Sequence, residues 1–66
     1  MERFIMFLEN GKITIQKSEY IDDGWYIEII GNIITLYEIP LFGGDVQVIG
    51  EFGTLIDAIN KGNNLT

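Results

Sequence analysis

The sequence predicts an α+β fold: a single domain over residues 1–66 with an antiparallel β-meander of about five strands and one short C-terminal helix packed on one face. Two observations carry this prediction. Asn-Gly and Gly-Asn pairs at 10–11 and 31–32 interrupt runs rich in Ile, Phe, Tyr and Thr, as two-residue hairpin loops do. A helix start signal followed by helically spaced apolar residues occurs once, near the C-terminus. A small SH3-like barrel is the alternative, because five short strands can also close around one core.

The first predicted hairpin joins strands near residues 3–8 and 12–17 through the turn Asn10-Gly11. Glu9 and Lys12 flank this turn as an opposite-charge pair. The pairing register predicts that one face is a clean core face, formed by Phe4, Met6, Leu8, Ile13 and Ile15. The opposite face is partly apolar and carries Ile5, Phe7, Thr14 and Gln16.

The second predicted hairpin joins strands near residues 25–30 and 33–39 through Gly31-Asn32. One of its faces carries Trp25, Ile27, Ile29, Ile34 and Leu36. The other face carries Tyr26, Glu28, Ile30, Ile33, Thr35, Tyr37 and Ile39. We expect the helix to pack on the first of these faces, which has the bulkiest apolar side chains. A chain this short has little material left to cover the second face.

A fifth strand near residues 45–51 and a helix near 54–61 complete the predicted domain. Thr54 suits the N-cap position, and Asp57 three residues later forms a partial capping box. Gly62 is expected as the C′ residue that ends the helix. About two turns of helix are marginal alone, so this helix must dock on the sheet.

Catalysis is poorly supported, because the chain contains neither His nor Cys, the commonest bases, nucleophiles and transition-metal ligands. Lys17 and Ser18 are neighbours on a predicted strand end, where successive side chains point to opposite faces. Glu19, Asp22 and Asp23 share one loop but lack the spacing of a calcium-binding loop, which indicates a solvated turn. We therefore expect no enzymatic activity, no catalytic residue, no cofactor and no metal site.

The charge balance is ten acidic residues against four basic ones, a net charge of −6. Such a field repels phosphate backbones and favours basic partners, so nucleic acid is not an expected partner. No apolar run approaches the roughly 18 residues that a membrane span requires, and the first residues lack a signal-peptide pattern. The expectation is a cytoplasmic protein with no membrane partner.

The segments GWYIEI, ITLYEI and VQVIGEFGTLIDAI follow one another as three strands and a helix. A G-x-F-x-T-x-x-x-A pattern leads into the helix and is formed by Gly50, Phe52, Thr54 and Ala58. Over about 35 residues the chain thus resembles DNA-binding modules of the AP2/integrase arm-binding type. Those modules read DNA with Arg and Lys on the sheet, whereas the corresponding face here carries Tyr26, Glu28, Thr35 and Tyr37. The resemblance therefore implies a local fold, and not a DNA-binding function.

The surplus of apolar and aromatic side chains is the main functional clue, because contiguous apolar surface often marks an interface. The candidate interaction residues are Phe7, Tyr26, Glu28, Ile33, Tyr37, Phe42, Asp22, Asp23, Asp45 and Glu51. Three outcomes stay open for the second sheet face. A second copy covers it in a homodimer, a basic protein covers it, or it is covered within the chain by Tyr20, Ile21, Leu41 and Phe42.

These observations predict a small, acidic, non-enzymatic protein-interaction module. Thirteen Ile against two Val and one Ala, with five Asn, is typical of an AT-rich coding sequence. The combination suits a phage-type or accessory protein that inhibits or modulates a larger host machine by occlusion. The alternatives are a nucleotide or small-ligand binder at a dimer interface, or a structural subunit. In the ligand-binding alternative, Tyr and Trp stack on a nucleobase while Arg3 and Lys17 hold phosphate.

Overall fold

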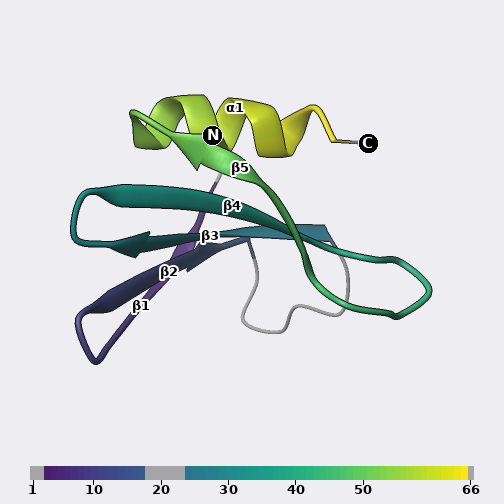
Figure 1. Cartoon of the computed structure of the whole chain (residues 1–66), viewed down its shortest axis with the longest axis horizontal. Helices are drawn as coiled ribbons and strands as arrows, with labels where there is room; N and C mark the ends of the chain where they lie inside the picture. Colours follow the sequence, from purple (N-terminus) through teal and green to yellow (C-terminus); the bar gives the residue numbers. More distant parts are fainter. Residues whose placement is uncertain (1–2, 18–23, 66) are drawn as a thin grey trace.

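The computed structural model of the protein describes residues 3–17 and 24–65. The predicted α+β fold is confirmed, because five antiparallel strands form one meander with a single helix packed against it (Figure 1). The elements are β1 (Ile5–Glu9), β2 (Lys12–Gln16), β3 (Gly24–Ile30), β4 (Ile33–Ile39), β5 (Gln47–Phe52) and α1 (Leu55–Asn63). The strands lie in the order β1-β2-β3-β4-β5, so β1 and β5 are the edges of an open sheet and the barrel alternative is wrong.

Both predicted hairpins form with the predicted register. In the first, Leu8 pairs with Ile13, and in the second, Tyr26 pairs with Tyr37. Asn10 and Gly11 have φ angles of 52° and 77°, the left-handed pair that a type I′ turn requires. Such turns match the right-handed twist of the strands, which explains why two residues are enough to reverse the chain.

The helix α1 packs over β3, β4 and β5, on the predicted face of the sheet. The core lies between them and consists of Ile15, Trp25, Ile27, Leu36 and Ala58. Ile27 and Leu36 are 0 % exposed, at paired positions in the two central strands. These central side chains therefore hold the helix to the sheet through apolar burial.

The helix does not extend over the first hairpin, which projects away from it (Figure 1). Met6 and Leu8 lie on the same face as the core residue Ile15, as predicted, but they are 65 % and 74 % exposed. The prediction of a clean core face is therefore wrong for these two residues. The helix runs along the strands of the sheet and not across them (Figure 1). With its side chains a helix is about 10–12 Å wide, whereas five strands span about 19 Å from edge to edge, so part of the face stays uncovered.

The two ends of α1 differ in how well the sequence predicts them. Thr54 is the N-cap, and its Oγ1 accepts a hydrogen bond from the Asp57 N–H at 3.2 Å, as expected. The predicted stop at Gly62 is wrong, because the helix continues through Asn63 and is capped by Asn64. Gly62 is buried within the helix, and a Cβ built on it would lie 2.5 Å from Cδ2 of Trp25. Glycine at this position permits close approach to the indole instead of ending the helix.

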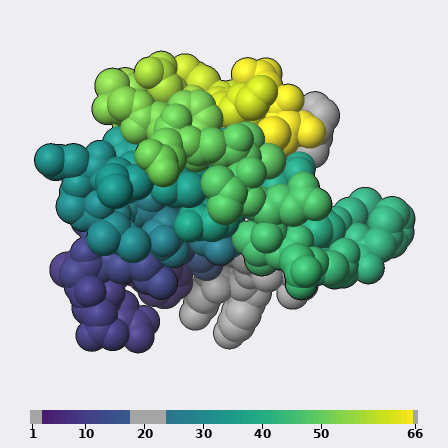
Figure 2. Space-filling model, in the orientation of Figure 1, coloured from purple at the N-terminus to yellow at the C-terminus, as the bar shows by residue number. Residues whose placement is uncertain are grey.

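The last strand begins at Gln47, two residues later than predicted, and contains an irregularity. Its pairing with β4 shifts register between Leu36 and Tyr37, which places Val48 opposite Tyr37. The β4–β5 loop before it projects from the body of the molecule (Figure 2). In the described part of the chain the helix is α1, which has nine residues. It is neither long enough nor apolar enough to cross a membrane.

Candidate functional site

The candidate site is the sheet face opposite α1, which we call the open face. Strand pairing places on it Ile5, Phe7, Glu9, Lys12, Thr14, Gln16, Tyr26, Glu28, Ile30, Ile33, Thr35, Tyr37, Ile39, Val48 and Glu51. No element in residues 3–17 and 24–65 packs against this face. Five of the ten predicted interaction residues meet there on the first four strands: Phe7, Tyr26, Glu28, Ile33 and Tyr37. A sixth, Glu51, joins them from β5.

A stacked pair of tyrosines lies at the centre of the open face. Tyr26 and Tyr37 are directly paired across β3 and β4, and their ring centroids lie 5.0 Å apart with an interplanar angle of 14°. Both side chains are half-buried. Cross-strand aromatic contacts of this kind stabilise a sheet and hold the rings in one orientation. The pair thus forms a flat, ordered aromatic platform with two phenol groups.

Glu28 joins this platform to the first hairpin. Its Oε1 accepts a hydrogen bond from the Tyr37 hydroxyl at 3.4 Å, and its Oε2 lies 3.5 Å from Nζ of Lys12. The Glu28 side chain is 19 % exposed, so these two partners stabilise a largely covered carboxylate. Glu9 and Lys12 flank the turn at paired positions, as predicted. Lys12 also forms an ion pair with Glu28 along the open face.

The surroundings raise the pKa of both tyrosines above the ordinary value of 10.0. Burial is the main cause for Tyr26, followed by the negative charge of Glu28 and the neighbouring Tyr37. For Tyr37, burial again comes first, the charge of Glu28 and the hydrogen bond to it add to the rise in pKa, and Lys12 opposes it. Both phenols therefore stay protonated at neutral pH and can donate hydrogen bonds.

Exposed apolar side chains also lie on the open face, where the Glu28–Thr35 pair separates Ile30 and Ile33 from the tyrosine platform. The exposed ones are Phe7, Ile30, Ile33 and Val48, which come from four different strands. An aromatic centre with apolar neighbours and a few charges at the margin is typical of a protein-binding surface. The same arrangement offers no nucleophile with an adjacent base, and no group of three carboxylates in the described ranges could hold a metal ion.

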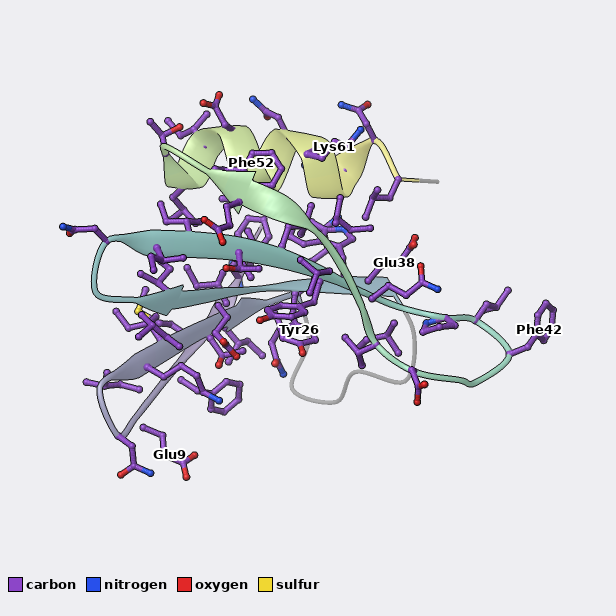
Figure 3. The ribbon with its side chains drawn as sticks, in the orientation of Figure 1. Glu9, Tyr26, Glu38, Phe42, Phe52 and Lys61 are labelled. Atoms are coloured by element: carbon purple, nitrogen blue, oxygen red, sulfur yellow. The ribbon has the colours of Figure 1, made fainter. Side chains whose placement is uncertain are left out.

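Other predicted interaction residues do not join the open face. Phe42 is 97 % exposed at the tip of the β4–β5 loop and points away from the sheet (Figure 3). Asp45 lies in the same loop, while Asp22 and Asp23 are outside the described residues. The proposed cover by Leu41 and Phe42 is therefore wrong, since both are strongly exposed. The other proposed cover, Tyr20 and Ile21, also lies outside the described residues, as does the acidic loop residue Glu19.

The aromatic residues invoked for nucleobase stacking are separated by the sheet. Trp25 lies on the helix face, 9 % exposed beneath Gly62, with Phe4 at a ring-centroid distance of 6.0 Å. Lys17, the expected phosphate ligand, lies over the same indole at 5.5 Å. Because Tyr26 faces the opposite side, Trp25 and the tyrosines form no common stacking site.

The sequence interpretation missed one surface, the uncovered part of the helix face along β1. Met6 and Leu8 remain exposed there, although the pairing register was predicted correctly. The prediction of a single helix was the available signal, since one helix about 10–12 Å wide cannot cover five strands that span about 19 Å.

No family model, no curated protein and no solved structure matches this chain. The resemblance to AP2/integrase arm-binding modules stays a prediction about the segment from β3 to α1.

Proposed function

We propose that this chain is a non-enzymatic interaction module whose open face binds a basic surface of a larger protein and occludes it. The observation that carries this proposal is the stacked Tyr26–Tyr37 pair, in which Tyr37 donates a hydrogen bond to Glu28, on a face that also bears exposed apolar side chains. Tyrosine is enriched at such surfaces because it contributes a large contact area and keeps a polar tip.

The charge of the open face supports a basic partner. Three carboxylates, those of Glu9, Glu28 and Glu51, share this face with the single ammonium of Lys12. The whole chain carries a net charge of −6, so its field attracts cationic surfaces and speeds their encounter. Two copies meeting through this face would bring like charges together, which favours a different protein as the occupant.

Occlusion requires only stable contact, and the open face is suited to it. The tyrosine rings are already ordered by stacking, so little conformational entropy is lost when a partner binds. The Tyr26 hydroxyl can donate a hydrogen bond to the partner, whereas that of Tyr37 already donates to Glu28. Glu51 at the margin can pair with Lys or Arg of the partner. A phage-type or accessory protein that blocks the basic cleft of a host machine fits this chemistry.

A matched pair of substitutions tests the proposal. Ile33 on the open face is 54 % exposed, and Ile56 on the outer side of α1 is 69 % exposed. Ile33→Lys places a cation on the proposed contact surface and should weaken capture of a host protein by at least about tenfold. Ile56→Lys adds the same charge elsewhere and should leave capture unchanged.

The salt dependence of capture provides a second measurement. Raising the salt from about 0.1 M to about 1 M shortens the Debye length from about 10 Å to about 3 Å, so a complex with a basic partner should release. Absence of any captured protein at low salt, or equal loss with both lysine variants, would contradict the proposal.

A further inference from the structure

The strand β1 is an edge of the sheet that no element within residues 3–17 and 24–65 covers. It pairs with β2 through five consecutive residues without a bulge, contains no Pro, and exposes Met6, Phe7 and Leu8. The other edge differs, because β5 has a register shift against β4 and continues directly into α1, which packs on it. Native proteins normally blunt an exposed apolar edge strand, and an edge left bare is a template for another strand.

The sequence along this edge is complementary to itself. Residues 3–9 read Arg-Phe-Ile-Met-Phe-Leu-Glu. In an antiparallel pair centred on Met6, Arg3 lies opposite Glu9 of the second copy, and the residues between them pair apolar with apolar. Ile5 then meets Phe7, and Phe4 meets Leu8. The two-fold symmetry repeats the Arg3–Glu9 ion pair at the other end of the seam.

The hydrogen-bonding pattern of the first hairpin is compatible with this register. In a two-residue hairpin the residues that flank the loop, here Glu9 and Lys12, form a hydrogen-bonded pair. Alternation then directs the backbone groups of Phe7 and Ile5 towards β2 and those of Met6 and Leu8 outward to the free edge. A pair of Met6 residues at the symmetry centre can therefore exchange both backbone hydrogen bonds.

The charges select this register over its nearest competitor. Centring the pair on Phe7 instead would set the apolar Ile5 opposite the carboxylate of Glu9 and leave Arg3 opposite Gly11. Centring it on Met6 gives two ion pairs and places no carboxylate opposite an apolar side chain. Both registers satisfy backbone hydrogen bonding, so side-chain complementarity decides between them.

We propose that two copies of this chain pair antiparallel along β1, centred on Met6, to form one continuous sheet. The pairing sets Met6 beside Met6 and Leu8 beside Phe4 of the second copy, which gives apolar neighbours to side chains that α1 does not reach. Residues paired across the seam point to the same side, so both helices lie on one side of the joint sheet and both open faces lie on the other. The dimer thus presents two open faces in one plane. This inference does not depend on the proposed function.

Disulfide trapping tests the register directly. The chain has no cysteine, so one introduced thiol reports one contact. With Met6→Cys the two Cα atoms lie about 5.5 Å apart, within disulfide range, and oxidation should give a covalent dimer. With Phe7→Cys the two Cα atoms lie on a diagonal about 7–8 Å apart, beyond the usual disulfide range, and little dimer should form. A dimer trapped efficiently by Phe7→Cys, or by neither variant, would overturn the register.

A charge swap tests the ion pairs. Light scattering over a hundredfold dilution should show a dimer for the native chain, and Arg3→Glu or Glu9→Arg alone should weaken it by about tenfold. Combining the two substitutions restores opposite charges at both ends, so the double variant should recover the native dissociation constant. A double variant as weak as the single ones would contradict the proposed seam.

A further pair of variants distinguishes this seam from the open face. Met6→Lys places two ammonium groups together at the symmetry centre and should give a monomer. Ile33→Lys lies on the open face and should leave the dimer intact. A dimer that resists Met6→Lys and is lost with Ile33→Lys would show self-association through the open face and would overturn the proposal. A native chain that stays monomeric over the whole dilution range would overturn it equally.

Discussion

The two faces of the β3–β4 hairpin differ in what their side chains contact, although the same two strands supply both. On the helix face, Ile27 and Leu36 are completely buried beneath Ala58. On the open face, Tyr26 and Tyr37 stack on each other, Tyr37 donates a hydrogen bond to Glu28, and both side chains are only half-buried. The comparison teaches that apolar content alone does not make a core in this chain. A face becomes core where a second layer covers it, and the uncovered face is left for binding.

Equivalent truncations on the two faces should therefore have very different effects. Ile27→Ala removes a fully buried side chain and should lower the free energy of unfolding by about 2–5 kcal/mol. Ile33→Ala, at a position that is 54 % exposed, should cost less than about 1 kcal/mol. Urea denaturation of both variants measures the difference. Similar losses would mean that the open face is covered as well as the helix face.

The contact between α1 and the sheet can be disturbed by one methyl group. Gly62→Ala adds a Cβ against the ring of Trp25, and the overpacking should lower the free energy of unfolding by about 1–3 kcal/mol. Helix propensity alone predicts the opposite, a gain of up to about 1 kcal/mol. Asn60→Ala, at an exposed position of α1, is the control and should be neutral or slightly stabilising. A Gly62→Ala variant that is more stable than the native chain would contradict the close packing.

The smallest expected effect is on the stability of the fold at alkaline pH, through the two tyrosines of the open face. Because the pKa of Tyr26 and of Tyr37 is raised above 10.0, the folded state favours the neutral phenols. This contribution to stability is complete below about pH 10 and is lost as the pH rises through the raised values. Loss of stability above pH 10 should thus be shallower when both tyrosines are changed to Phe.

The phenolate absorbance of the native chain provides the matching titration. Subtracting the titration of the Tyr26→Phe/Tyr37→Phe variant isolates these two phenols, and the midpoint of the difference should lie above 10.0. Glu28→Gln removes a negative charge and should move the native midpoint back towards 10.0. An unchanged midpoint in Glu28→Gln would mean that the carboxylate does not act on the tyrosines.

Much of the fold could be predicted because its signals are local. Asn10-Gly11 and Gly31-Asn32 set the two hairpins, and period-two alternation then assigned side chains to faces correctly. The N-cap Thr54 was predictable for the same reason, since a cap depends on residues within one turn. The open face, the central part of the candidate site, followed from this alternation.

What could not be predicted depends on residues distant in the sequence. Glycine is the residue type that commonly ends a helix, so the sequence alone suggests a stop at Gly62. Only the position of Gly62 against Trp25 shows that it permits close packing. Lys12 has a suitable partner across its own turn, yet the twist and pairing of β2 with β3 direct it to Glu28. Met6 and Leu8 alternate correctly but stay exposed, because where α1 sits on the sheet decides which apolar residues are covered. Strand pairing and facing are encoded in neighbouring residues, whereas burial is a property of the layer above, and that layer is placed only when the whole chain packs.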